Sequence, residues 1–214
     1  MPTAERAAAE KSDRVSRRQV DKFEERRREL ADAALHTLST LGYARTSLRE
    51  IAQNSSFSHG VLHYYFRDKV DLIMYCVRRY KAVCVLRYDQ IVTVARTPEG
   101  LAQGFADGLV GTLVADDTMH RLWYDLRSQA LFEESFREDV LEIDATLQRM
   151  IWRIVNRYSE LTGVEALTSP SMTYAMFDGL FQQALLRRFA CVEGACEQLH
   201  AGTLQLLGQV VPTS

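Results

Sequence analysis

The sequence predicts an all-α protein, and three observations support that prediction. Long stretches place apolar residues three or four positions apart, which is the period of a helix with one buried face. No run of alternating β-branched residues appears, and only 4 prolines interrupt the 214 residues. Hydrophobic residues make up 47% of the chain, which is enough for an ordinary buried core. The length suits one large domain or two small ones.

The first helix is predicted over residues 18–41. Its apolar positions, Phe23 and Leu30 among them, fall near helical spacing, and Gly42 supplies a stop at its C-terminal side. The preceding residues 1–17 are rich in Ala, Arg and Glu and carry no apolar periodicity. We therefore expect a flexible basic arm there.

Two short helices and the start of a long one follow. Ser47 begins the second helix, and Glu50 stands three residues later, which is the spacing of a capping box. We expect the third helix to begin at Ser56 or Phe57. Asp68 is expected to cap a fourth helix that runs to about residue 95.

Turn residues divide the remainder of the chain into further helices. The breaks are placed at Asp116 and Asp117, at Gly163, at Pro170 and at Gly194. The predicted ranges are 98–115, 117–131, 133–162, 170–190 and 192–210.

Charge is divided unevenly along the chain, although the formal net charge is only -2. Residues 1–81 hold 16 Lys and Arg against 11 Asp and Glu, whereas residues 82–214 hold 10 against 17. A basic head on an acidic body is typical of a protein that binds nucleic acid with its head. Chance segregation of solvated faces would give the same balance.

The third helix carries a mixture of side chains suited to DNA contact. The major groove of B-DNA admits one α-helix, and a glycine at position 60 would let the backbone approach it closely. Hydroxyl, imidazole and ammonium groups can bond phosphates and base edges. Packing would explain His63 or Tyr65 individually, but the whole set favours DNA contact. The candidate residues are Thr46, Ser47, Ser58, His59, Gly60, His63, Tyr64, Tyr65 and Lys69.

Residues 20–75 also resemble the TetR (tetracycline repressor) family of bacterial regulators. The matching residues are Gly42, Tyr43, Thr46, Ile51, Ala52, Ser58, Gly60, Leu62, Tyr65, Phe66, Lys69 and Leu72. The chain departs from the family at residues 55–57, where Ala-Gly-Val is usual, and at His63, where Tyr is usual. The resemblance implies an all-helical homodimer with an N-terminal three-helix DNA-binding domain and a C-terminal domain that holds a small-molecule pocket.

Large aromatic side chains concentrate in the centre of the chain, and ligand pockets are lined by such groups together with a few polar ones. Trp123 and Arg127 stand four residues apart and so share a helix face, which could hold an apolar ligand with an anionic end. The same residues would also suit a closed core. The candidate ligand-binding residues are Trp123, Tyr124, Arg127, Phe105, Tyr88 and Trp152.

The last two predicted helices carry few charges, which suits a four-helix dimer interface built from two copies of each. A helix pair inside one chain would show the same pattern. We favour the interface, because a single helix-turn-helix reads too few base pairs for useful specificity.

No feature of the sequence indicates an enzyme, a metal or a cofactor. Glu197 and His200 have the spacing of a carboxylate-bridged di-metal site, but such a site needs a second pair and two further glutamates. No apolar signal segment or membrane span is found, and the 4 cysteines suit reduced thiols, so we expect a cytoplasmic protein.

Together these observations predict three parts: a flexible basic arm over 1–17, a helix-turn-helix DNA-binding domain over 18–67, and a ligand-binding and dimerisation domain over 68–214. We expect a dimeric transcriptional repressor that binds a palindromic operator, is released by a small-molecule effector of unknown identity, and has no membrane partner. The alternatives are a ligand-independent dimeric DNA-binding regulator, or a helical small-molecule-binding protein or enzyme.

Overall fold

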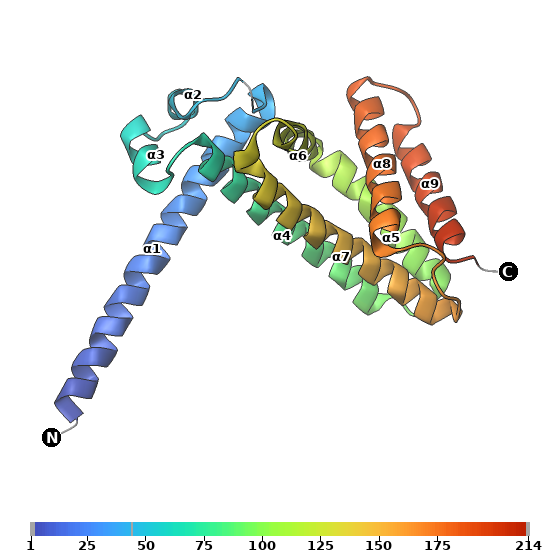
Figure 1. Ribbon diagram of the computed structural model, residues 1–214, viewed down its shortest axis with the longest axis horizontal. Coiled ribbons are helices and arrows are strands. Elements are labelled where there is room, and N and C mark those ends of the chain that lie inside the picture. The colour runs from blue at the N-terminus through green and yellow to red at the C-terminus, as the bar shows by residue number, and fades with distance from the viewer. Residues whose placement is uncertain (1–2, 44, 213–214) are drawn as a thin grey trace. The chain divides into compact units, whose positions relative to one another are not determined.

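The computed structural model describes residues 3–43 and 45–212, with side chains from residue 18 onward except those of residues 36, 39 and 44. Every regular element in these residues is helical, which confirms the all-α prediction. The elements are α1 Thr3–Leu41, α2 Leu48–Gln53, α3 His59–Tyr65, α4 Lys69–Val94, α5 Pro98–Ala115, α6 Asp117–Ala130, the short 3-10 helix η1 Glu134–Phe136, α7 Arg137–Thr162, α8 Pro170–Phe189 and α9 Ala195–Val210 (Figure 1). The chain forms two compact units, divided inside α4 between Cys76 and Val77.

Helix α1 begins at Thr3, well before the predicted start at residue 18. The expected flexible arm over 1–17 is therefore corrected to helix from Thr3 onward. Ala, Glu and Arg, which are abundant in this segment, have high intrinsic helix propensity. The missing apolar periodicity indicates that the segment has no packing face, and a helix can still form there. The predicted stop is confirmed, because Gly42 has a φ of 75°.

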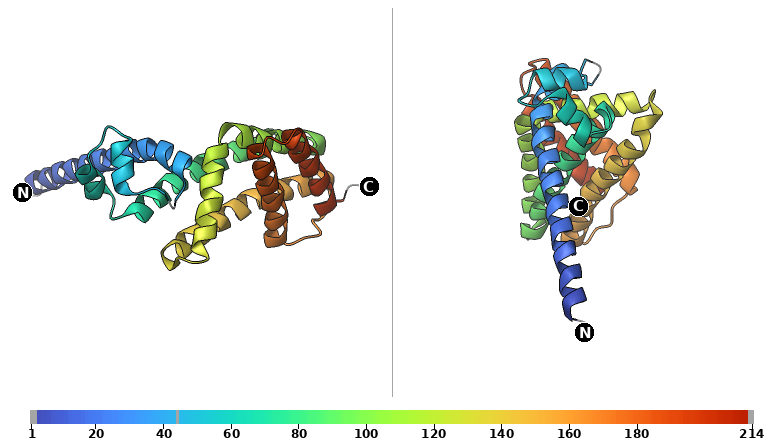
Figure 2. Two further views of the ribbon diagram at one scale, coloured as in Figure 1. Left: turned by 90° about the horizontal axis from the view of Figure 1, so that it is seen from above. Right: turned by 90° about the vertical axis from the view of Figure 1, so that its left-hand side faces the viewer.

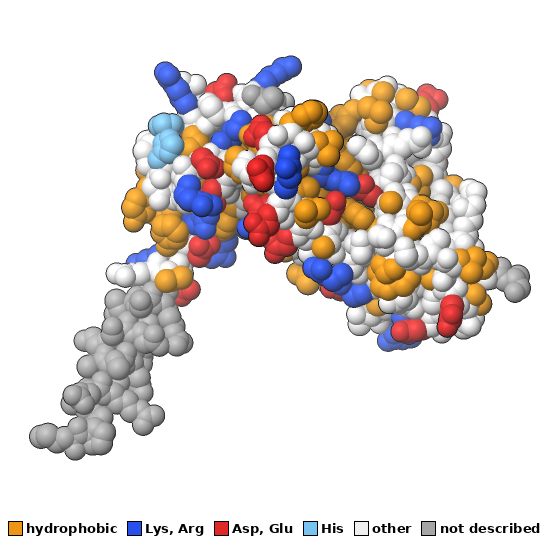
Figure 3. Space-filling view, viewed as in Figure 1, with side chains coloured by type: hydrophobic (Ala, Val, Ile, Leu, Met, Phe, Trp, Pro, Cys, Tyr) orange, Lys and Arg blue, Asp and Glu red, His pale blue; other side chains and the backbone are white. Residues whose placement is uncertain are grey.

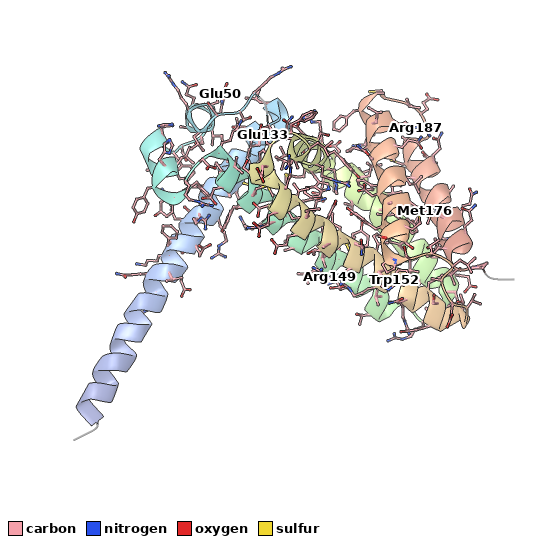
Figure 4. The ribbon with its side chains drawn as sticks, viewed as in Figure 1. Glu50, Glu133, Arg149, Trp152, Met176 and Arg187 are labelled. Atoms are coloured by element: carbon pink, nitrogen blue, oxygen red, sulfur yellow. The ribbon has the colours of Figure 1, made fainter. Side chains whose placement is uncertain are left out.

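The caps of the two short helices show how local sequence sets their limits. Ser47 and Glu50 form the predicted capping box, with the Ser47 amide donating to Glu50 Oε2 at 2.7 Å (Glu50 is labelled in Figure 4). Helix α3, however, begins at His59, later than predicted. Its cap is Ser58, whose hydroxyl accepts from the Val61 amide at 3.3 Å.

The first unit is a three-helix arrangement completed by the first turns of α4. Helices α2 and α3 pack on each other and on α1 (Figure 2). The core is apolar, with Leu30, Ile51 and Leu62 fully buried. Arg27 joins three elements, since its guanidinium pairs with Asp71 at 3.4 Å and lies 4.8 Å from the centre of the Phe66 ring.

The second unit is a helical bundle. Helix α8 packs against α7 and α9, and α5 packs against α9 and α7; α8 and α9 lie side by side in both Figure 1 and Figure 2. Arg78 on α4 pairs with Asp139 and Glu142 on α7. Arg153 on α7 pairs with Asp89 on α4, at 2.7 Å. The second half of α4 is thus held along α7 by charged contacts.

No described helix is both long enough and apolar enough to cross a membrane. In the part of the chain that the structure describes, all 4 cysteines are free thiols. Cys76 and Cys84 are buried.

Candidate functional site

Helix α3 presents a polar and aromatic face to solvent. His59 and His63 are exposed, and their rings lie 4.4 Å apart between centres; Figure 3 shows this histidine surface in pale blue over α3. Tyr64 is 73% exposed. A Cβ added at Gly60 would meet no atom within 4 Å, so packing inside the protein does not require a glycine there.

Other predicted DNA-contacting residues have structural partners. Thr46 is only 2% exposed, and its hydroxyl donates to the Gly42 carbonyl at 2.7 Å. Lys69 donates to the Tyr43 carbonyl at 3.0 Å. Tyr65 is half-buried against the ring of Phe23. The exposed residues Ser47 and Ser58 use their hydroxyls as caps of α2 and α3.

The second unit contains a partly open cavity of about 60 Å³. Helices α4, α5, α6, α7 and α8 all contribute to its wall. Most of the wall is apolar or aromatic, with a few polar groups from α4, α5, α6 and α8. Its lining residues include Lys81, Cys84, Tyr88, His120, Trp123, Tyr124, Tyr174, Phe177 and Asp178.

The structure brings three of the six predicted ligand-binding residues to this wall: Tyr88, Trp123 and Tyr124. Phe105 lies behind it, fully buried, with its ring centre 6.0 Å from that of Tyr88. Trp152 is a half-buried residue of α7 outside the lining (labelled in Figure 4).

Arg127, the sixth predicted residue, is already paired with carboxylates. Its guanidinium lies 2.5 Å from Asp178 on α8 and 3.4 Å from Asp144 on α7. Tyr124 donates to Asp178 at 3.0 Å, and Tyr174 donates to Asp144 at 2.6 Å. This network joins three helices at one side of the cavity and leaves the Arg127 charge neutralised by protein groups.

Lys81 is a wall residue that the sequence reasoning missed. It is 4% exposed, and burial lowers the pKa of its ammonium to about 8. Its Nζ lies 3.3 Å from Nδ1 of His120. Its position in the sequence could have indicated this role. Lys81, Cys84 and Tyr88 stand on one face of α4, where a lysine interrupts an otherwise apolar or aromatic stripe.

The contacts of His120 fix its protonation. Burial and the nearby charges of Lys81 and Arg87 lower the pKa of its imidazole well below the usual range. The ring is therefore neutral and has one donor and one acceptor. Because an ammonium only donates, Nδ1 accepts from Lys81 and Nε2 donates to the Tyr80 hydroxyl, 3.0 Å away.

The indole nitrogen of Trp123 is buried and has no hydrogen-bond partner in the structure. A buried N–H group without an acceptor is uncommon in proteins. It stands in the same wall as Lys81, whose Nζ lies 5.3 Å from the centre of the Trp123 ring.

The possible metal pair of α9 is not assembled with other ligands. His200 Nε2 lies 3.2 Å from Asp107 Oδ1. In the described part of the chain, no group of three or more His, Cys, Asp or Glu side chains is arranged to hold a metal ion.

A capped helix followed by an exposed reading helix, on a separate helical body, defines the class of helix-turn-helix DNA-binding regulators. Residues 30–76 match the sequence profile of the bacterial regulatory proteins of the tetR family. The first unit therefore carries a TetR-family DNA-binding domain, and the chain is similar to transcriptional regulators over most of its length.

Curated relatives share this description. The chain is 44% identical over 48 residues to the HTH-type transcriptional regulator BetI of Paraburkholderia phytofirmans, covering 22% of this chain and 25% of that protein. It is 26% identical over 169 residues to BetI of Escherichia coli O139:H28, covering 75% of this chain and 83% of that protein.

Solved structures share the fold. A TetR transcription regulator from Haloarcula marismortui has a TM-score of 0.72 at 18% identity, covering 88% of this chain and 99% of that one. The regulator FadR from Bacillus subtilis, crystallised in complex with stearoyl-CoA, has a TM-score of 0.69 at 17% identity, covering 83% and 95%.

Proposed function

We propose that this regulator is a cytoplasmic repressor that binds a palindromic operator as a homodimer and is released by a small molecule held in the cavity. The exposed face of α3 carries the proposal for DNA. Gly60 has open space where a side chain would stand, and His59, His63 and Tyr64 surround it on the solvent side. Such a face lets the helix backbone come close to base edges while its neighbours donate hydrogen bonds.

The proposed dimer interface is the outer face of α8 and α9. A shallow groove there is lined by small and apolar or uncharged residues, and it contains no charged side chain. Gly179, which lines this groove, has nothing within 4 Å of an added Cβ, so a partner helix can approach its backbone. Leu180, Leu206 and Met176 supply apolar surface (Met176 is labelled in Figure 4). A low-charge, self-complementary face suits a two-fold interface.

The position of the cavity against α4 supports control by ligand through movement of that helix. An engineered apolar cavity of roughly 150 Å³ admits benzene, whereas this cavity measures about 60 Å³. A ligand must therefore widen it. Because α4 supplies Lys81, Cys84 and Tyr88 to the wall and its first turns belong to the DNA-binding unit, widening is expected to displace α4. In a dimer, the two α3 helices must lie one turn of DNA apart, about 34–36 Å, to enter successive major grooves. If a ligand changes that separation, both helices lose their base contacts together.

Binding to a fragment of the protein's own promoter region tests this function. Affinity should fall steeply between low and moderate salt, as expected when phosphate contacts release counterions. Tyr64→Ala should lose at least tenfold in affinity with an unchanged melting temperature. The matched control is Phe132→Ala, which removes another exposed ring, 83% exposed, from the second unit. Absence of salt-sensitive binding by the wild type would refute the proposal.

A regulator that needs no ligand is the second candidate, and the small volume of the cavity favours it. The two are separated by adding small molecules to the promoter complex. Ligand control is supported if a compound releases promoter DNA from the protein and leaves the wild type and Phe132→Ala equally folded.

A further inference from the structure

We propose that the cavity of the second unit takes a compact carboxylate with an apolar body, whose anionic end bonds Lys81 Nζ and accepts from Trp123 Nε1. This inference rests on the proposed ligand control and specifies the class of ligand. The sequence prediction paired the anionic end of the ligand with Arg127, whereas this inference pairs it with Lys81.

The charge of Lys81 is the first argument. Among the described residues, no carboxylate lies within ion-pair distance of its Nζ, and its hydrogen-bond partner is the neutral His120. Asp144 and Asp178 are near enough to favour the ammonium, but both are paired with Arg127. Burial outweighs them, so the pKa of Lys81 is lowered. A buried cation in this state gains from an anion placed beside it.

The orphaned indole is the second, independent argument. Trp123 Nε1 is a buried donor with no acceptor, in the wall that also holds Lys81. A carboxylate has two oxygens with about four lone pairs, and hydrogen bonds of this kind span roughly 2.7–3.0 Å. Lys81 Nζ lies 5.3 Å from the indole ring centre, so the two donors belong to neighbouring parts of one wall, and the proposal places one carboxylate between them.

The remainder of the wall determines the polarity and charge of the part of the ligand that lies away from its anionic end. Leu109, Leu147, Met150, Ile151, Phe177 and Phe181 present apolar surface from three helices, α5, α7 and α8. A cationic ligand fits poorly, because it would face Lys81, and the one acidic wall residue, Asp178, already accepts from Tyr124 and Arg127. Because the cavity must widen for any such ligand, a body of one ring or a short branched chain is the kind that requires the least widening.

Three planar probes of similar shape and different charge test this inference on the purified full-length protein. They are benzoate, benzamide and benzamidine, with charges of −1, 0 and +1, and their binding is measured by calorimetry at pH 7. Benzoate should bind at least tenfold more tightly than benzamide, and benzamidine should show no binding. Lys81→Met should lose the preference for benzoate. The matched control is Lys22→Met, which removes an exposed lysine from α1 and should leave benzoate binding unchanged.

A second variant separates the two donors. Trp123→Phe removes the indole N–H while keeping a ring, and it should weaken benzoate severalfold with little effect on benzamide. Circular dichroism and melting temperature show whether each variant is folded. An equal loss for both probes would assign Trp123 a packing role only.

Tighter binding of benzamide or benzamidine than of benzoate would overturn the inference, and so would an unchanged benzoate affinity in folded Lys81→Met. It would also be overturned if benzoate showed no binding at concentrations up to about 10 mM, where even a weak complex would form. Release of promoter DNA is measured separately. Release by benzamidine would keep ligand control and reject the carboxylate. Binding of benzoate without release would keep the carboxylate site and reject ligand control.

Discussion

The ammonium of Lys81 lies 3.3 Å from Nδ1 of His120, and this imidazole is its one hydrogen-bond partner among the described residues. Burial destabilises the charged form of both groups and therefore lowers the pKa of both. A lysine that only packed there could be replaced by an apolar residue with a gain in stability. Its presence in a cavity wall supports the proposed ligand site, where the buried charge would serve binding at a cost to folding.

Replacing Lys81 by Met should stabilise the protein at pH 7. Met keeps the length of the side chain and removes the buried charge, so the free energy of unfolding should rise by about 1–3 kcal/mol. Thermal and urea unfolding of the wild type, Lys81→Met and Lys22→Met measure this effect. The exposed Lys22→Met should stay within about 0.5 kcal/mol of the wild type. A lower stability of Lys81→Met would show that the ammonium is well satisfied.

The stability difference between these two proteins should depend on pH in a defined direction. The pKa of Lys81 is about 8 in the folded protein and 10.5 unperturbed. Between these values the unfolded chain binds more protons, so the wild type gains stability as pH rises. The advantage of Lys81→Met should therefore be largest below pH 8 and shrink towards pH 10.5.

Comparing the two proteins isolates Lys81 from the other ionisable groups that surround it. These are Tyr80 and Cys84 on α4, His120, Tyr124 and Arg127 on α6, Asp144 on α7, and Tyr174 and Asp178 on α8. All are present in both proteins, so the groups whose ionisation does not depend on Lys81 cancel in the difference. His120 does interact with Lys81, but burial is the largest cause of its lowered pKa, and it is neutral from pH 8 to pH 10.5 in both proteins. A constant advantage from pH 6 to pH 10 would mean that Lys81 does not titrate in this range.

Local signals predicted the helices well, and long-range contacts limited the prediction of the cavity. The capping box of Ser47 and Glu50 and the stop at Gly42 depend on residues within one turn. The shared face of Trp123 and Arg127 is likewise confirmed, with the guanidinium 5.9 Å from the ring centre. The carboxylates that neutralise Arg127, however, come from α7 and α8, and helical spacing carries no information about which helices meet.

Thr46 should prove to be a stability residue. Its buried hydroxyl donates to the Gly42 carbonyl and so satisfies an acceptor at the end of α1. Thr46→Val keeps the shape and leaves that carbonyl without its donor, which should cost about 1–2 kcal/mol of stability. Thr46→Ser should restore most of it. A promoter-binding measurement at a temperature where all three are folded should give similar affinities, and a specific loss for Thr46→Val would instead support DNA contact.

Placing a charge at the proposed interface should give a monomer. Leu206 lines the low-charge groove of α8 and α9. In a two-fold dimer, Leu206→Arg would introduce one cation from each copy into the same apolar face. Sedimentation should then show the mass of one chain, 24.4 kDa, instead of two. Leu131→Arg is the control, since Leu131 is 76% exposed at the end of α6. A dimeric Leu206→Arg would place the interface elsewhere.

Gly60→Ala separates the demands of folding from those of DNA binding. Alanine has a higher helix propensity than glycine, and an added Cβ at residue 60 meets no atom within 4 Å, so stability should hold or rise by up to about 1 kcal/mol. In a major groove, the same methyl group would stand between the helix backbone and the base edges. Promoter affinity should therefore fall by tenfold or more.

Gly111 provides a matched control for that substitution. It lies on an exposed position of α5 in the second unit, and an added Cβ there also meets nothing within 4 Å. Gly111→Ala should give the same gain in stability with no change in promoter affinity. If Gly60→Ala binds the promoter as tightly as Gly111→Ala does, α3 does not approach DNA through Gly60. The glycine would then have no explanation in either folding or recognition, because the space around it within the protein is open.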